Sequence, residues 1–566
     1  MSQNLVLSTT AALSGAGALW LFWRAFRRYI VRSTLADIDG PAPDSWFTGN
    51  LAEFFSPLAY DWHHNLIARW GSTVKTYGFF GDEQIYTIDP RAMDFIMKNN
   101  ELFEEQEYFL QGNMLWFGEG LLSTRGKVHT RQRRTIFPVF GVQSLRNLTP
   151  LAYGITKEVR EIMLKDVKEK GPHEIDMHDW MSRGSLDYIS KLGLGYSFDA
   201  LDDSKPNAYR DIVKNFIPVL VRTAVIRQLI PKFVKLGPAW FQDPRISYLM
   251  LFPVYSGVLW FRRFIVNITP FEHVKLLKKF SDVLINTSDE VLVSKEKEIA
   301  RGDEDVKDQI AHGKDIMSIL LRQNMNKKDG EKLDRDELLG QISTLIFTAQ
   351  DTTAAGLSRA LQVLAYHPDV QNELRAEVTA SRINGDLDYN ALMGLPLLDA
   401  VCRETLRMYP PVAFTLRTSM TEVVLPLSRP VTGKSGEVHT QLRIPKDVDV
   451  CVGIVLANKD KALWGPDADE WRPKRWLEPM PEGIQELSGI YNNMMTFGVG
   501  PRSCIGLKFA EMEMKIVLSV LLETFVFDKP SREICWQLGN IQVPYLAGTE
   551  ESLKPNLPLR VSLVEN

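Results

Sequence analysis

The chain contains little of what marks a secreted, zinc-binding or nucleic-acid-binding protein. Its 566 residues include only four cysteines, and no two of them form a CxxC pair: Cys402, Cys451, Cys504 and Cys535. This number and spacing argue against a disulfide framework and a zinc site, and they suit a reducing compartment. A formal net charge of −4 over this length argues against nucleic acid as a partner.

Linkers and repeats are also missing. The chain has no Gly/Ser-rich linker and no internal repeat, and 45% of its residues are hydrophobic, as in a globular protein with a large core. Length alone would suggest roughly three or four domains. Without linkers, one large catalytic domain over residues 51–566 with an N-terminal appendage is the simpler prediction.

One long uncharged apolar run is present, at residues 5–23. As a helix it would span about 28 Å, close to the hydrocarbon thickness of a bilayer. Arginines follow the run, whereas a cleaved signal peptide carries its basic residues ahead of it. We therefore predict a single-pass anchor within residues 1–32, with the N-terminus lumenal and the catalytic domain cytosolic. Residues 33–50, which contain Gly-Pro-Ala-Pro, form the predicted stiff linker.

A second apolar stretch, residues 246–260, is interrupted by Pro253 and Gly257. It is too short and too broken to span a membrane. Two interpretations stay open: a segment of the core, or a patch that rests on the bilayer surface.

Ten residues near the C-terminus, Phe497–Gly506, place Cys504 in a loop. The sequence predicts that three glycines let this loop fold back tightly: Gly498, Gly500 and Gly506. Arg502 lies two residues before the cysteine, and an amphipathic stretch begins directly after the loop. A helix dipole and a guanidinium would both lower the pKa of the thiol, and such a thiolate is a fitting ligand for heme iron. A small cysteine buried only for packing is the alternative.

A helix of about 50 Å is predicted over residues 334–366. Asp334 and Glu337 have capping-box spacing, and the stretch contains no proline before Pro368. Its middle, residues 347–353, reads Phe-Thr-Ala-Gln-Asp-Thr-Thr. In a buried helix these hydroxyls could simply bond to the backbone at a bend.

The C-terminal motif resembles the Phe-Gly-x-Gly-x-Arg-x-Cys-x-Gly signature of the cytochromes P450 at every fixed position. The resemblance implies that Cys504 is the proximal ligand of heme b iron and that Arg502 pairs with a heme propionate. It also implies that Phe497 packs near the sulfur.

The run at 347–353 resembles the family pattern Ala/Gly-Gly-x-Asp/Glu-Thr-Thr. This implies a hydroxyl beside bound O2 at Thr352 and a carboxylate that delivers protons through water at Asp351. Thr348 and Ala349 depart from the usual residues but remain small, and Thr348 is expected to narrow or polarise the oxygen groove.

Glu404 and Arg407 stand three residues apart, so they share a helix face and could form an ordinary surface ion pair. With Arg475 downstream they resemble the Glu-x-x-Arg motif and the arginine segment of the family. The resemblance implies a buried cluster of three charges, which we interpret as structural because such a cluster must satisfy each member. Lys474 stands where glutamate is common.

His129 and Arg133 lie four residues apart in a basic stretch. They resemble the family's propionate-binding pair, and Arg417 resembles a third propionate ligand. A solvated basic helix is the alternative, because four further basic residues surround the pair: Arg125, Lys127, Arg131 and Arg134. Both interpretations can hold, and the outer residues would then form a dock for an acidic reductase.

The resemblance runs from about residue 40 to the C-terminus and implies a cytochrome P450 fold, mainly α with a smaller β part, preceded by one transmembrane helix. Strands are expected at 73–77, 84–88 and 559–564. The implied function is a monooxygenase of the endoplasmic reticulum membrane that uses O2 and electrons from NADPH–cytochrome P450 reductase. A hydroperoxide-rearranging heme-thiolate enzyme and a non-catalytic heme-binding protein are the alternatives.

The expected substrate is bulky and lipophilic and is reached partly from the lipid bilayer. Candidate pocket residues are an aromatic-rich loop at 108–122 and five single positions: Phe347, Thr348, Phe414, Thr415 and Tyr545. Residues 456–460 and 491–497 look most like P450s of mushroom-forming fungi. That resemblance implies a terpenoid or sterol-like secondary metabolite, with an aromatic xenobiotic as the alternative.

Overall fold

A computed structural model describes residues 33–204, 208–229, 272–301, 314–328, 330–539, 541–549 and 554–565, together with Gly15, Leu19 and Trp23. The predicted anchor, apart from those three residues, and the apolar stretch 246–260 lie outside this part of the chain. Among the residues that the structure describes, no helix combines the length and the apolar character needed to cross a membrane. The boundaries predicted at residues 32 and 50 stay predictions.

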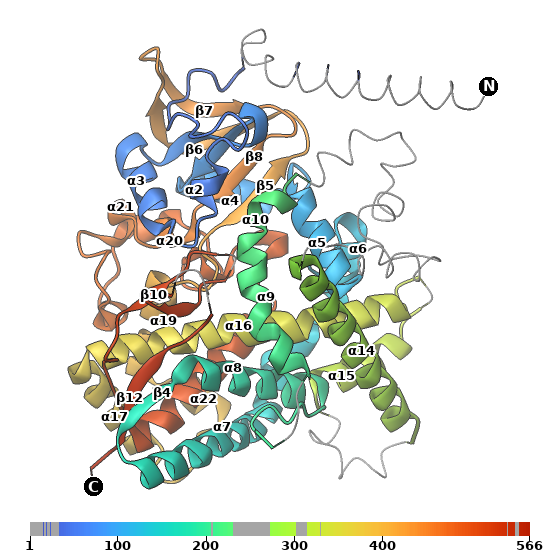
Figure 1. Ribbon diagram of the computed structural model, residues 1–566, viewed down its shortest axis with the longest axis vertical. Helices are drawn as coiled ribbons and strands as arrows, with labels where there is room; N and C mark the ends of the chain where they lie inside the picture. The colour runs from blue at the N-terminus through green and yellow to red at the C-terminus, as the bar shows by residue number, and fades with distance from the viewer. Residues whose placement is uncertain are drawn as a thin grey trace. The chain divides into compact units, whose positions relative to one another are not determined.

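The chain forms two compact units, each built from three separate stretches. The first contains residues 1–108, 222–266 and 415–453, and the second contains 109–221, 267–414 and 454–566. Figure 1 follows the elements of both units by colour and label.

The first unit is built on a five-stranded sheet in the order β1-β2-β8-β5-β3. Neighbouring strands are antiparallel except β2 and β8, which run parallel. The strands are β1 (Thr73–Tyr77), β2 (Glu83–Thr87), β3 (Phe103–Glu105), β5 (Thr415–Ser419) and β8 (Asp449–Val452). Val74, Ile85 and Val450 are fully buried in this sheet. The strand predicted at 73–77 is confirmed. The strand predicted at 84–88 is found one residue earlier, as β2.

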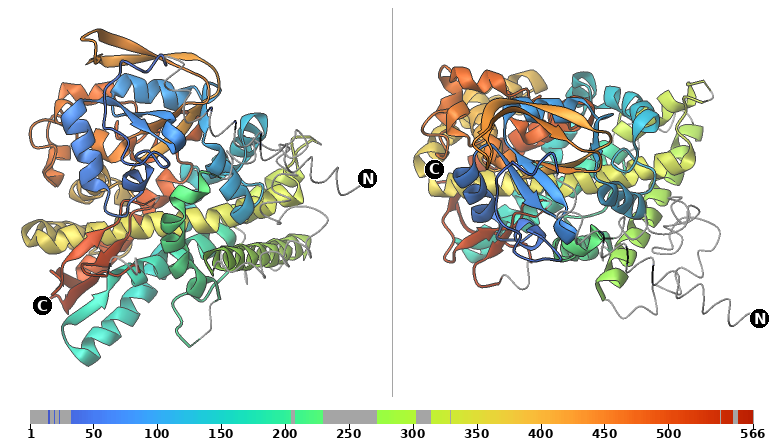
Figure 2. Two further views of the ribbon diagram at one scale, coloured as in Figure 1. Left: turned by 45° about the horizontal axis from the view of Figure 1, so that its top comes forward. Right: turned by 90° about the horizontal axis from the view of Figure 1, so that it is seen from above.

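A hairpin and short helices complete the first unit. The hairpin pairs β6 (Val423–Thr432) with β7 (Val438–Ile444), drawn in orange in Figure 2. The helices are α2 (Leu51–Phe54), α3 (Tyr60–Trp70), α4 (Pro90–Lys98) and α10 (Ala224–Arg227). Asp89 caps α4 by accepting from the Ala92 amide at 3.0 Å and also accepts from the Arg429 amide at 2.8 Å. One carboxylate therefore starts α4 and fixes the hairpin to it.

The second unit is mainly helical. Its helices are α5 (Glu107–Phe117), which begins in the first unit, α6 (Gly126–Ile136), α7 (Val142–Lys170), α8 (Met177–Tyr188), α9 (Ala208–Arg222), α14 (Glu272–Arg301), α15 (Ile316–Met325), α16 (Arg335–Tyr366), α17 (Pro368–Ser381), α18 (Tyr389–Met393), α19 (Pro396–Met408), α20 (Ile454–Ala457), α21 (Lys461–Trp464) and α22 (Leu507–Thr524). Two small sheets join them: β4 (His173–Asp176), β12 (Pro558–Leu563) and β9 (Phe525–Asp528), and the pair β10 (Ile534–Trp536) and β11 (Pro544–Leu546).

Helix α16 is the central element of the second unit. The predicted capping box is present: Asp334 Oδ1 accepts from the Glu337 amide at 2.9 Å, and Glu337 Oε2 accepts from the Asp334 amide at 3.1 Å. The helix ends at Tyr366, just before Pro368 begins α17. It packs against α8, α14, α19 and α22, as the yellow ribbon in Figure 1 shows. The predicted long helix is therefore confirmed.

Helix α22, which follows the cysteine loop, is buried on most of its faces rather than on one. Met512, Glu513 and Lys515 are all enclosed, where an amphipathic pattern predicted a polar, exposed side. Lys515 is satisfied by Asp399, whose carboxylate lies 2.7 Å from its Nζ.

Candidate active site

The loop before α22 is made of two short 3-10 turns, η7 (Met495–Phe497) and η8 (Gly500–Arg502). The Cys504 amide donates to the Phe497 carbonyl at 2.9 Å, which closes the loop. Gly498 and Gly500 have φ of 68° and 75°, a region that only glycine adopts without strain. Gly506, with φ of −89°, needs no such freedom and serves as the N-cap of α22. The prediction that three glycines make the turn is therefore wrong for Gly506.

The residue Cys504 as a whole has an exposed surface, although its thiol group is enclosed, while Cys402 and Cys451 are buried throughout. Burial of the thiol group raises the pKa of Cys504, and the Gly506 and Leu507 amides and the Arg133 guanidinium lower it in part. The lowering by the amides at the start of α22 agrees with the sequence prediction, whereas the contributing guanidinium is Arg133 rather than Arg502 and burial outweighs both effects. Because a metal binds the thiolate, an iron ion at this sulfur would have to displace the proton.

Three basic side chains gather beside this loop: His129, Arg133 and Arg502. Arg133 Nη2 donates to Ser503 Oγ at 3.0 Å, and Arg502 Nη2 donates to the Thr124 carbonyl at 2.9 Å. The pKa of His129 is lowered to about 3, mainly by burial and further by the charges of Arg502 and Arg133. The imidazole is therefore neutral at physiological pH. Burial and the Arg502 charge also lower the pKa of Arg133, against a raising effect of Cys504.

This donor set fits a heme. Cysteine sulfur is a ligand for heme iron, and two half-buried arginines, Arg133 and Arg502, suit the two carboxylates of the propionates. The crowding of Arg133 and Arg502, which lowers the pKa of both His129 and Arg133, would be relieved by such an anionic group.

The middle of α16 presents an open face within a buried helix. Thr348, Ala349 and Thr352 are partly exposed, whereas Phe347 and Thr353 are buried. Thr352 Oγ1 donates to the Thr348 carbonyl at 2.7 Å, and Thr348 Oγ1 donates to the Thr344 carbonyl at 2.7 Å. Each hydroxyl group donates its hydrogen to a backbone carbonyl. Its oxygen can therefore accept a hydrogen bond from a group on this face of the helix.

Asp351 lies on the same helix but is buried. Its Oδ2 atom has no hydrogen-bond partner in the part of the chain that the structure describes. Burial raises the pKa of Asp351 to about 7, so the carboxyl group changes its protonation near neutral pH. A group of this pKa both takes up and releases protons readily at physiological pH.

The comparisons with known proteins decide the family. The family model described as cytochrome P450 matches residues 41–243 and 245–543. The chain belongs to the cytochrome P450 family. It is therefore an oxidoreductase whose heme iron is ligated by a cysteine thiolate, and it acts on lipophilic substrates with O2 and a redox partner.

Its relatives include P450 monooxygenases of fungi. The chain is 40% identical over 560 residues to cytochrome P450 monooxygenase 81 of Postia placenta, covering 98% of each chain. It is 36% identical over 562 residues to a ganoderic acid synthetase of Ganoderma lucidum, again with 98% of each covered. A cytochrome P450 monooxygenase of Hericium erinaceus is 34% identical over 574 residues, covering 100% of this chain and 99% of that one.

The structure brings Glu404, Arg407 and Arg475 of this P450 into one buried cluster. The Arg407 guanidinium donates to both Glu404 oxygens at 2.8 and 2.9 Å and to the Asn458 and Ala468 carbonyls at 2.7 and 2.8 Å. Arg475 Nε lies 3.3 Å from Glu404 Oε1, and its Nη1 donates to Asp467 at 2.8 Å.

The structure shows the protein neighbours of two predicted heme contacts, Phe497 and Arg417, and the heme contacts themselves stay predictions. Phe497 packs against Tyr491 with ring centroids 5.3 Å apart and accepts from the Cys504 amide through its carbonyl. Arg417 lies on β5 in the first unit, where its Nη1 donates to Glu105 Oε2 at 2.7 Å and to Thr415 Oγ1 at 2.6 Å. That Arg417 holds a propionate stays a prediction.

Two of the predicted surface and pocket features are corrected. Arg131 is not part of an outer basic patch, because its Nη2 pairs with the buried Glu337 at 2.5 Å. Residues 107–117 form helix α5 rather than a loop, and Phe117 of this helix stacks on Phe347 at 4.7 Å. Phe216 meets the same ring at 5.4 Å, so the wall beside the open face of α16 is aromatic.

Two buried groups of the second unit, one of them close to Asp351, were not foreseen from the sequence. Tyr209 on α9 is buried with its hydroxyl unpaired in the described residues, and its pKa is raised well above the usual value by burial and then by Asp351. Glu513 on α22 accepts from Ser185 Oγ at 2.5 Å, and burial raises its pKa to about 8. Neither has a local sequence signal, since each depends on helices from distant parts of the chain.

Proposed function

We propose that this P450 oxidises a terpenoid or sterol-like metabolite with electrons from NADPH–cytochrome P450 reductase. The observation that carries the proposal is the pairing on α16 of a buried carboxyl group with a pKa of about 7, Asp351, and an adjacent accessible hydroxyl, Thr352. This pairing suits a reaction that consumes protons inside the protein.

The heme, when bound through Cys504, supplies the activation of O2 and the oxidation of the substrate. One oxygen atom of O2 leaves as water, which takes two protons. Asp351 takes protons up and hands them on near neutral pH. The Thr352 oxygen, whose own proton is held by the Thr348 carbonyl, accepts a hydrogen bond and positions the proton-carrying water.

Phe117, Phe216 and Phe347 form a buried aromatic cluster next to Thr348 of α16, and a bulky hydrocarbon skeleton beside this helix would pack against it. The similarity to a ganoderic acid synthetase points to the triterpenoid class. An aromatic xenobiotic is the alternative substrate that the same surface accommodates.

Three exposed basic residues on or next to α6 suit an acidic reductase: Arg125, Lys127 and Arg134. Phe137, at the end of this helix, is 60% exposed and adds an apolar contact. We expect Lys127→Glu and Arg134→Glu to slow reduction of the heme by the reductase without changing the heme spectrum. Lys165→Glu on α7, an exposed lysine elsewhere, is the matched control.

The proposed location is the endoplasmic reticulum membrane, with residues 1–32 as the anchor and the catalytic part in the cytosol. In intact microsomes, protease added from the cytosolic side should digest the catalytic part. Full protection of the catalytic part would overturn this orientation.

The function is tested with purified holoenzyme, the reductase, NADPH and a panel of triterpenoids, sterols and aromatic compounds. We expect at least one triterpenoid to shift the heme spectrum and to increase NADPH consumption, with an oxygenated product. NADPH consumption that no bound compound increases would overturn the monooxygenase reaction. Conversion of a lipid hydroperoxide without reductase would identify the rearranging enzyme instead.

A further inference from the structure

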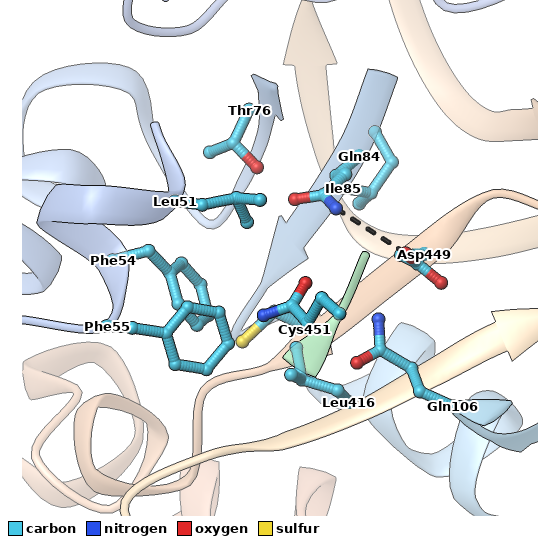
Figure 3. A pocket seen from close by; sticks show the side chains of 11 residues that line it. Leu51, Phe54, Phe55, Thr76, Gln84, Ile85, Gln106, Leu416, Asp449 and Cys451 are labelled. Atoms are coloured by element: carbon cyan, nitrogen blue, oxygen red, sulfur yellow. Dashed lines mark hydrogen bonds between the residues drawn. The ribbon is translucent and has the colours of Figure 1, made fainter. Parts of the chain in front are cut away.

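Buried polar atoms that lack a hydrogen-bond partner indicate where a water or another small polar group fits. One such place is the small cavity of the first unit between α2 and the five-stranded sheet. Figure 3 shows it, with Gln84 donating to Asp449 and the Gln106 amide at its edge. The cavity has room for about one water molecule, so it admits no larger ligand.

A second such place lies in the second unit, where a hydroxyl group and a carboxyl group are both enclosed. Tyr209 on α9 is 2% exposed, and Asp351 on α16 is 6% exposed. Among the described residues, neither Tyr209 Oη nor Asp351 Oδ2 has a hydrogen-bond partner. Each atom would lose free energy of solvation without compensation if it stayed unpaired in the folded protein.

A cluster of aromatic rings brings these two groups near each other. The Tyr209 ring lies 6.5 Å from Phe280 of α14, and Phe280 lies 6.2 Å from Phe347 of α16. Asp351 follows Phe347 by four residues, so the two side chains share a face of α16. Phe216, seven residues after Tyr209 on α9, lies 5.4 Å from Phe347, where α9 crosses α16 in Figure 1. The same face of α9 therefore carries Tyr209 toward the part of α16 that holds Asp351.

The charge of Asp351 acts on the Tyr209 hydroxyl group. Burial, and then the charge of Asp351, raises the pKa of Tyr209 well above its usual value, so the phenol keeps its proton and serves as a donor. The pKa of Asp351 is raised by burial alone, because Tyr209 is uncharged at the pH where the carboxyl group titrates. The two groups are thus close without a direct hydrogen bond, an arrangement that one bridging water completes.

The other buried ionisable groups on the helices packed against α16 have partners of their own. They are His178 with Ser358, Arg183 with the Ala200 carbonyl, Asp187 with Lys191, Lys295 with Asp315, Glu404 with Arg407, Glu513 with Ser185 and Lys515 with Asp399. None of them shifts the pKa of Asp351.

We propose that Tyr209 is a positioning residue for proton delivery, and that its hydroxyl group donates through one buried water to Oδ2 of Asp351. When Asp351 is ionised, this water accepts from the tyrosine and donates to the carboxylate. A proton taken up by Asp351 passes on to the water that Thr352 positions, while Tyr209 keeps its own proton. The role in proton delivery rests on the proposed function, whereas the hydrogen bond itself does not.

The first test is an infrared titration of substrate-free holoenzyme from about pH 5 to about pH 9, which follows the C=O stretch of protonated carboxyl groups. Asp351→Asn and Glu513→Gln assign the two bands. Tyr209→Phe removes only the hydroxyl group, so the ionised Asp351 loses a donor and its midpoint should rise by about half to one pH unit. The midpoint of Glu513, whose pKa burial raises to about 8, should stay in place. An unchanged Asp351 midpoint would overturn the proposal.

Tyr188→Phe is the matched control, because it also removes a buried tyrosine hydroxyl group from the second unit. In the wild type, Tyr188 Oη donates to the Ala152 carbonyl at 3.0 Å. This variant should leave the Asp351 midpoint unchanged. If both variants shift the midpoint alike, the shift reflects looser packing in general and the proposal fails.

The second test measures product and hydrogen peroxide per NADPH across the same pH range, with a panel compound that increases NADPH consumption in the wild type. In Tyr209→Phe, product per NADPH should fall at least about threefold, and its pH dependence should move upward with the infrared midpoint. A pH dependence that stays in place while the infrared midpoint moves would remove Tyr209 from proton delivery. Full coupling in Asp351→Asn would overturn the proton path of the proposed function. The infrared midpoint, which needs no turnover, separates that failure from failure of the hydrogen bond.

Discussion

Glu404 and Arg407 form a two-pronged ion pair at 2.8 and 2.9 Å, with neither side chain exposed to solvent. Each carboxylate oxygen has a second donor, because the Arg472 amide reaches Oε1 and Trp476 Nε1 reaches Oε2, both at 3.0 Å. A buried ion pair is tolerated when its remaining hydrogen-bonding capacity is used, as it is here. The pair ties α19 to the segment at 458–476, and its role is structural.

Replacing Arg407 with lysine should destabilise the protein by about 3 kcal/mol, because one ammonium cannot serve both carboxylate oxygens and the carbonyls together. The measurement is urea unfolding of the holoenzyme with the heme content per chain. Lys474→Ala is the control: this lysine lies 3.0 Å from Glu373 but is about half exposed, so the change should stay below about 1 kcal/mol. An Arg407→Lys protein as stable as the wild type would show that the pair is dispensable.

Asp351→Asn should lower turnover about 10²-fold and remove a pH dependence centred near pH 7, because asparagine cannot carry a proton. The same substitution should raise the free energy of unfolding although it lowers turnover. The pKa of Asp351 is higher in the folded state than in the unfolded chain, so the wild type loses stability as pH rises from about 4 to 7. The asparagine variant avoids this loss, so its gain in stability over the wild type should be about 4 kcal/mol at pH 8 and should shrink to about 1.5 kcal/mol at pH 5. A stability difference independent of pH would contradict the assigned pKa.

Thr352→Ala should raise hydrogen peroxide release relative to oxygenated product, because the hydroxyl that positions the proton-carrying water is gone. Thr352→Ser keeps the hydroxyl and is the matched control. Peroxide and product are both measured per NADPH consumed. Coupling that is unchanged in the alanine variant would remove Thr352 from the proton path.

Arg133→Gln should weaken heme retention about tenfold, because it removes one cation from the cluster beside Cys504. Arg134→Gln, on the exposed face of the same helix, should change it less than about twofold. The rate of heme transfer to apomyoglobin measures heme retention in both variants. Equal losses in the two variants would contradict the placement of Arg133.

The sequence is informative where the relevant interactions are local. The capping box at Asp334 and Glu337, the stop at Pro368 and the Cys504 loop each depend on neighbours within a few residues, and each is found as predicted apart from Gly506. The strand pattern at β1 is equally local.

Interactions between distant segments were not predictable in the same way. Arg133 acts on the Cys504 sulfur and Arg131 pairs with Glu337 because α6 packs beside the cysteine loop and the start of α16. The raised pKa of Asp351 depends on burial by surrounding helices, α9 with Tyr209 among them. No spacing along the chain carries this information.

The bond between the Cys504 sulfur and heme iron is tested most directly by the ferrous–carbon monoxide spectrum of the purified holoenzyme, read together with electron paramagnetic resonance of the ferric form. We predict a thiolate-type spectrum for the wild type and its loss in Cys504→Ala, while Cys535→Ala keeps it. An imidazole-type spectrum in the wild type, or a thiolate-type spectrum that persists in Cys504→Ala, would contradict the account.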